Sequence, residues 1–218
     1  MNDLLDDFGE QISFTDKEIF TQIWTKPKEV LSYVHDTQHD KYVIILLVFA
    51  GISKSLDRAV MRDMGDQIPL ALILGKSIFL GGLLGWLTYY VYSALVSWTG
   101  KWLGGNADTN SILRVLAYAM IPSIVALFFV FLQIGVYGQE IFKADGDTTS
   151  GGMISQIIFF GSAAMELILG ILTLIYCVIG ISVVQEFGTT KAFFNLIFPI
   201  LILLIPILIL ILGIGAFK

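Results

Sequence analysis

The sequence predicts an all-α polytopic membrane protein with five transmembrane helices and an N-terminal interfacial amphipathic helix. Of its 218 residues, 56% are hydrophobic and 14% are charged, whereas soluble domains average roughly 45–50% and about 25%. The mean hydropathy is +0.81, and the apolar residues gather in five long runs. Such a chain has too little polar surface for a water-soluble globule, so we expect the lipid bilayer to be its solvent.

Residues 1–18 are predicted to be an acidic flexible tail. Nine of the eighteen acidic residues lie in the first forty positions, so the net charge of −5 belongs mainly to this part of the chain. The stretch lacks the basic and apolar regions of a signal peptide. The chain also has no basic stripe of the kind that holds nucleic acid, so we expect no nucleic-acid partner.

Residues 19–41 are predicted to be an interfacial amphipathic helical segment. Ile19, Val30 and Val34 belong to an apolar stripe at helical spacing, and Pro27 suits the first turn of a helix. One apolar stripe with flanking lysines and a tryptophan is typical of a helix that lies flat in the headgroup region. The alternative is a segment that packs on the protein's own spans.

Residues 42–218 are predicted to be a five-helix transmembrane domain. A span needs about 20 apolar residues, at about 1.5 Å rise each, to cross about 30 Å of hydrocarbon. Prolines at positions 122, 199 and 206 each remove a backbone hydrogen bond and are expected to bend their helices. The five apolar runs are Tyr42–Ile52, which charged residues then interrupt, Ile68–Val96, Ile112–Val136, Met153–Val184 and Ala192–Phe217.

The basic residues in the loops favour a cytoplasmic N-terminus and a C-terminus outside. With that orientation the inner segments carry seven, Lys17, Lys26, Lys28, Lys41, Lys101, Arg114 and Lys191. The outer segments carry five, Lys54, Arg58, Arg62, Lys143 and Lys218.

Several ionisable residues fall inside the predicted spans, at comparable depth in one leaflet. They form a predicted intramembrane polar cluster of Lys54, Asp57, Arg58, Lys76 and Glu166. Charges in hydrocarbon are costly, so we interpret them as functional or paired. The functional hypothesis is a pocket or pathway for ions, protons or lipid headgroups. The alternative is a Lys76–Glu166 ion pair that orders the bundle, with Lys54 extending toward the interface.

Two glycines in the second run, Gly81 and Gly85, have the spacing that lets helices approach closely. We expect this contact to be made within the chain rather than between two copies.

The sequence contains few residues that could bind a metal or catalyse a reaction. His35 and His39 stand four residues apart, and on a helix they could supply two metal ligands, although a polar linker is the alternative. Cys177, the single cysteine, lies in an apolar run. Since no hydrolytic constellation is present, we expect no enzymatic activity and no cofactor.

Three stretches together resemble the Yip1 family in its compact prokaryotic form. They are Ile23 to Val30, Leu103-Gly104-Gly105 leading to the run Leu113 to Pro122, and Ile179 to Gln185 leading to Thr190-Lys191-Ala192. The residues that carry the resemblance are Trp24, Pro27, Gly104, Gly105, Tyr118, Pro122, Gly180, Gln185 and Lys191.

The resemblance implies a five-span, non-enzymatic membrane protein that organises membrane or assists trafficking or assembly of membrane proteins. Partners would be other membrane proteins or a second copy. Eukaryotic members bind Rab-type GTPases, but this chain has neither their long N-terminal region nor their Asp-Leu-x-Gly-Pro motif, so we do not expect a Rab-type partner. The compact form favours the bacterial inner membrane, with an endomembrane as the alternative. The alternative function is a translocator that uses the intramembrane polar cluster.

Overall fold

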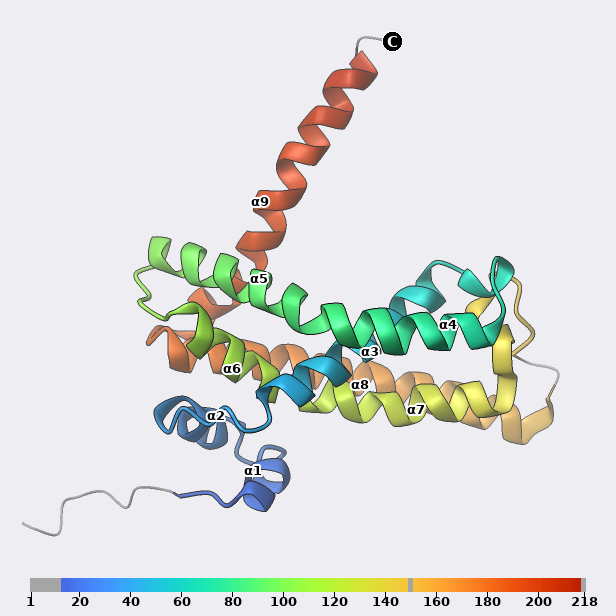
Figure 1. Cartoon of the computed structure of the whole chain (residues 1–218), viewed down its shortest axis with the longest axis horizontal. Coiled ribbons are helices and arrows are strands. Elements are labelled where there is room, and N and C mark those ends of the chain that lie inside the picture. The colour runs from blue at the N-terminus through green and yellow to red at the C-terminus, as the bar shows by residue number, and fades with distance from the viewer. Residues whose placement is uncertain (1–12, 149–150, 217–218) are drawn as a thin grey trace, which may run out of the picture.

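The computed structural model describes residues 13–148 and 151–216, and within these ranges the chain is helical and contains no β-strand (Figure 1). The elements are α1 Asp16–Gln22, α2 Pro27–Asp36, α3 Val43–Met61, η1 Met64–Asp66, α4 Leu70–Lys76, η2 Ser77–Gly81, α5 Gly82–Trp102, α6 Thr109–Ala119, α7 Ile121–Tyr137, η3 Gly138–Phe142, α8 Gly152–Val184 and α9 Thr189–Ala216.

Three helices are long and apolar enough to cross a membrane, which confirms three of the five predicted spans. They are α4 to α5, continuous over Leu70–Trp102, then Ile121–Phe142, and Gly152–Val184. These helices run along the long axis of the molecule, whereas the end of α9 projects away from the bundle (Figure 1). The protein is therefore an integral membrane protein. The first and last spans remain predictions, because α3 carries three charges near its end and α9 qualifies only as a shorter apolar helix over Thr189–Ile202.

The third apolar run was predicted as one bent helix, and that prediction is wrong. Its helix ends at Ala119 and a new one begins at Ile121, with Met120 between them at φ −78° and ψ −3°. Pro122 stands in the first turn of α7, where a missing N–H removes no helical bond. The proline therefore starts a helix instead of bending one.

The N-terminal apolar stripe is covered by the protein itself. Residues Ile19, Val30, Leu31 and Val34 are fully buried, and α2 packs on α6 and α8. This arrangement corrects the prediction of an interfacial helix, because α6 and α8 offer the apolar surface that lipid was expected to supply. In addition, α1 begins at Asp16, inside the predicted tail, where Thr15 and Glu18 form a capping box. Residues 1–12 of that tail lie outside the described residues.

The second span crosses α3 at three glycines. A Cβ placed on Gly51 would stand 2.6 Å from the Cα of Gly85 and would also meet the carbonyl oxygen of Gly81. The two backbones thus touch directly, which only glycine permits. Gly81 and Gly85 therefore make their close contact within the chain, as the sequence predicts.

Candidate functional site

The residues that carry the family resemblance gather mainly at one end of the bundle. This motif end consists of the last turn of α5, the loop 103–108, α6, the last turn of α8 and the first turns of α9, with α2 against it (Figure 1). Segments that are distant in sequence meet here, so we take the motif end as the candidate site.

The centre of the motif end is a buried hydrogen-bond network around Gln185. Its side-chain oxygen accepts from the Ala107 N–H at 3.1 Å, and its side-chain nitrogen donates to the Asn195 oxygen at 3.3 Å. The Asn195 amide donates in turn to the Val96 carbonyl at 3.0 Å and to the Thr99 hydroxyl at 2.7 Å. Gln185 is 2% exposed and Asn195 is fully buried. The network therefore joins α5, the loop 103–108, the end of α8 and α9 in the interior of the motif end.

Glycines line the space that Gln185 occupies. A Cβ on Gly100 would stand 2.7 Å from the Gln185 side-chain carbon Cδ, and one on Gly105 would stand 2.8 Å from it. Both distances are shorter than real Cβ contacts allow. The Gln185 side chain therefore fits between these two positions only because both residues are glycine. Gly104 takes φ +88° in the same loop, and Gly180 lies directly beneath Val115 of α6.

The remaining motif residues serve other parts of the same end. Lys191 donates to the carbonyl of Leu103 at 3.0 Å and so ties α9 to the loop. Tyr118 is fully buried in α6, and Pro27 is the first residue of α2. Trp24, between α1 and α2, stays 38% exposed.

An ion pair anchors the loop between α2 and α3 to α6. The Arg114 guanidinium donates to both carboxylate oxygens of Asp40, at 2.7 and 3.1 Å. The Arg114 side chain is 8% exposed and that of Asp40 is 68% exposed. The Asp40 carboxylate therefore supplies the hydrogen-bond acceptors that the nearly buried Arg114 guanidinium requires.

Replacing Asp40 with alanine is expected to lower the free energy of unfolding by about 2–3 kcal/mol, because the Arg114 charge loses both acceptors. Thermal unfolding in detergent measures the loss. The matched control is Glu29→Ala, which breaks the exposed Lys26–Glu29 pair at 3.4 Å and should cost about 0.5 kcal/mol or less. Equal losses in the two variants would contradict this account of Arg114.

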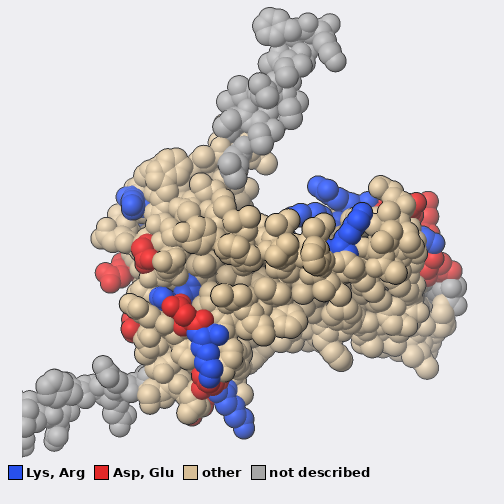
Figure 2. Space-filling model, in the orientation of Figure 1, with Lys and Arg blue, Asp and Glu red and all other residues tan. Residues whose placement is uncertain are grey.

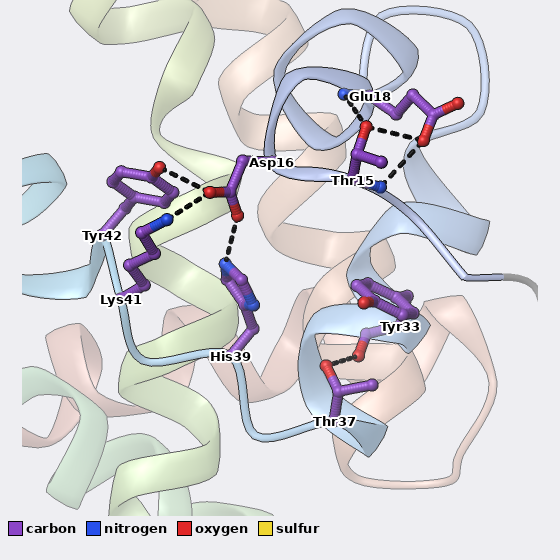
Figure 3. Close-up of polar contacts among 8 residues, drawn as sticks. All are labelled: Thr15, Asp16, Glu18, Tyr33, Thr37, His39, Lys41 and Tyr42. Carbon is purple, nitrogen blue, oxygen red and sulfur yellow. Dashed lines mark hydrogen bonds and ion pairs between the residues drawn. The ribbon is translucent and has the colours of Figure 1, made fainter.

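A second anchor holds α1 through Asp16 (Figure 3). The Asp16 carboxylate accepts from the Lys41 ammonium and from the Tyr42 hydroxyl at 3.0 Å, and His39 lies 3.5 Å away. The hydrogen bond from Lys41, followed by that from Tyr42, lowers the pKa of Asp16 below its ordinary value of 3.8. This contact therefore binds α1 most firmly while Asp16 is ionised.

The docking of α1 is expected to weaken in acid. A carboxyl group whose pKa is lowered in the folded state stabilises that state at pH values above its ordinary pKa, which is 3.8 for Asp16. This stabilisation is lost as the pH falls through the lowered pKa. The protection of the α1 amides, measured as hydrogen exchange relative to the intrinsic rate at each pH, should therefore fall below about pH 4. Asp16→Asn should show the faster exchange already at pH 7, whereas Asp36→Asn, which changes an exposed carboxylate on α2, should not. Identical exchange in wild type and Asp16→Asn at pH 7 would refute the anchor.

The two histidines predicted as metal ligands point to different places. The helix α2 ends at Asp36 and Gln38 takes φ +51°, so the spacing of four residues no longer places His35 and His39 on one face. His39 contacts Asp16, while His35 lines a pocket. Among the described residues no group of three metal-ligating side chains occurs, and the metal candidates find no support.

That pocket lies at the motif end and has a volume of about 250 Å³. It is lined by His35, Asn106, Ala107, Asp108, Ser111, Val184, Gln185 and Glu186. A second pocket is an apolar groove of about 370 Å³ between α8 and α9. None of the predicted intramembrane charges lines either pocket.

The predicted intramembrane polar cluster is only partly brought together. Lys54 lies 3.9 Å from Asp57 on α3. Glu166 accepts a 2.8 Å hydrogen bond from the Gln133 amide of α7, and the Lys76 side chain is exposed on α4. Within the described ranges no Lys76–Glu166 ion pair forms, so that alternative is wrong. The partner that sequence reasoning missed was Gln133, although a lone polar residue inside an apolar run is a signal that could have found it. Asn195 gives the same signal in α9.

A comparison with curated proteins finds no match, and a comparison with solved structures finds none either. The family model described as the Yip1 domain matches residues 21–211. This range includes the Gln185 network, both anchors apart from Asp16, and every residue on which the resemblance depends. The chain belongs to the Yip1 family.

Proposed function

We propose that this protein is a non-enzymatic organiser of the membrane, which assists the assembly or trafficking of other membrane proteins through the surface of its spans. In this proposal it resides in a bacterial inner membrane with its N-terminus in the cytoplasm, and all five apolar runs cross the bilayer. Its partners are other membrane proteins or a second copy of the chain.

The observation that carries the proposal is how little of the spans the protein buries. In the most apolar stretches of the three spanning helices, only 22%, 33% and 39% of the residues are buried inside the chain. The surface of these helices that is not buried carries large apolar side chains such as Phe79 and Leu167, which are 70% and 67% exposed. A protein with this much apolar surface in the membrane plane offers contact area to lipid and to neighbouring helices.

The motif end supports the same proposal. Its buried polar groups Gln185, Asn195 and Arg114 bind other groups of the protein and so hold the helices in place. The Gln185–Asn195 network is buried, Arg114 is paired with Asp40, and the pocket beside them is small. A motif end that is held together by these contacts and packed against α1 and α2 favours a structural role over a catalytic one. The translocator hypothesis lacks comparable support, since Glu166 is hydrogen-bonded to Gln133 within the bundle.

Site-specific photocrosslinking in living cells tests this function. A crosslinking amino acid at Phe79 or at Leu167 should yield adducts with other membrane proteins or a second copy, whereas the exposed position Lys28 on α2 should yield far fewer. Capture of lipid alone at both span positions would overturn the proposal. Ion or proton flux in proteoliposomes that Glu166→Gln abolishes would instead establish the translocator.

A further inference from the structure

The helices α3 and α4 carry three exposed cations, of which only Lys54 has a carboxylate partner among the described residues. The side chains of Lys54, Arg58 and Lys76 are exposed, and Figure 2 shows blue side chains gathered over α3 and α4 on one face of the molecule. Within the described ranges neither Arg58 nor Lys76 has an acidic partner within 4 Å, and Asp57 lies 3.9 Å from Lys54. This basic group, Lys54, Arg58 and Lys76, therefore carries excess positive charge.

The glycine crossing places Arg58 and Lys76 at roughly the same height in the bundle. The helices α3 and α4–α5 are joined by a short loop and run antiparallel, with Gly51 against Gly81 and Gly85. Arg58 lies about two helical turns beyond Gly51, and Lys76 lies about two turns before the middle of the Gly81–Gly85 contact, which is about 10 Å in each case. Two cations from neighbouring helices thus stand at one level.

That level is close to a membrane surface. Lys76 is the seventh residue of the spanning helix Leu70–Trp102, which places its Cα about 9 Å from the start of the helix. Lysine and arginine stems reach outward from such depths so that their charges meet the headgroups. Exposed apolar side chains surround the group, with Met61 81% exposed, Leu72 51% and Ile78 52%. Lipid tails cover such a surface, so the anion nearest to the cations is a lipid phosphate.

We propose that Lys54, Arg58 and Lys76 form a binding site for an anionic phospholipid, whose acyl chains lie on the apolar surface of α3 and α4. The guanidinium of Arg58 binds the phosphate with two parallel hydrogen bonds, and the lysines add charge around it. An anionic headgroup is preferred over a zwitterionic one because the three cations outnumber the two carboxylates on this side of the bundle, Asp57 and Glu166, which lie within electrostatic range of each other. This proposal does not depend on the proposed function, since it concerns other residues.

Lipid competition on the purified full-length chain tests the site. The protein is reconstituted in vesicles that contain equal amounts of phosphatidylglycerol and phosphatidylcholine, extracted mildly, and its bound lipid is counted by native mass spectrometry. Wild type should retain phosphatidylglycerol preferentially. Removing one cation, as in Arg58→Gln or Lys76→Gln, should weaken that preference about fivefold. Arg58→Lys keeps the charge but loses the two parallel hydrogen bonds, so it should retain more of the preference than Arg58→Gln and less than wild type.

The matched control is Lys28→Gln combined with Lys101→Gln, which removes two exposed cations outside the basic group. This control should keep the wild-type preference, whereas Arg58→Gln combined with Lys76→Gln should not. Equal retention of the two lipids by wild type would overturn the proposal, and so would equal effects of the two double variants. Displacement of phosphatidylglycerol by millimolar inorganic phosphate would also overturn it, because the site would then bind free anions.

Discussion

Replacing Gly51 with alanine is expected to lower the free energy of unfolding by about 1–3 kcal/mol, and leucine should cost more. The reason is geometric, because the new Cβ would stand 2.6 Å from the Gly85 Cα and would also meet the Gly81 carbonyl. Both neighbours are backbone atoms, so no side chain can rotate away and the two helices must separate. Thermal unfolding of the purified protein in detergent measures the loss.

A control on the helix that α3 crosses separates this clash from a general effect of glycine. A Cβ on Gly75 would have no atom within 4 Å, so Gly75→Ala should leave stability unchanged or raise it by up to about 1 kcal/mol. Gly85→Ala should behave like Gly51→Ala. The double variant should lose less than the sum of the two, because helices that have already separated meet no second clash. If Gly51→Ala melts at the wild-type temperature, the two backbones do not touch.

Sequence reasoning succeeds where composition alone decides. The fourth apolar run was predicted from Met153 to Val184, and α8 spans Gly152–Val184, because polar, glycine-containing segments bound a long run in which Glu166 is the only charged residue. The prediction that Gly81 and Gly85 pack within the chain is confirmed for a similar reason, since a neighbouring helix lies one short loop away. In both cases the information is local.

Sequence reasoning fails where the answer depends on which element covers a face. The apolar stripe that includes Val30 and Val34 predicts an amphipathic helix, but periodicity does not tell whether lipid or α8 covers it. Likewise, rise per residue estimates the depth of Glu166 without the direction of its side chain, so it could not distinguish Lys76 from Gln133 as the partner. The Gln185 network is subject to the same limit, because its members come from four segments and meet only in the folded chain.

Replacing Gln185 with leucine is expected to be among the most damaging single changes in the protein, at about 2–5 kcal/mol of unfolding free energy. Leucine fills a similar volume but leaves the Ala107 N–H and the Asn195 oxygen without their buried partner, and each such group costs about 1–3 kcal/mol. Since Gln185 links α8 to α9, the damage should appear first as loosening of α9. Thermal unfolding measures the loss, and thiol labelling of Ala192→Cys, a fully buried position at the start of α9, measures the loosening.

The neighbouring residue provides the control. Glu186 is exposed, so Glu186→Gln should change stability by less than about 0.5 kcal/mol and leave the labelling rate unchanged. Combining Gln185→Leu with Asn195→Leu should cost less than the sum of the single variants, because the two side chains bond each other and the second change finds that bond already broken. Strict additivity, or slow labelling of Ala192→Cys in the Gln185→Leu background, would show that α9 is held by its other contacts and does not depend on Gln185. Gly105, Gln185 and Lys191 would then lie close together at one end of the bundle without coupling the stability of α8 to that of α9.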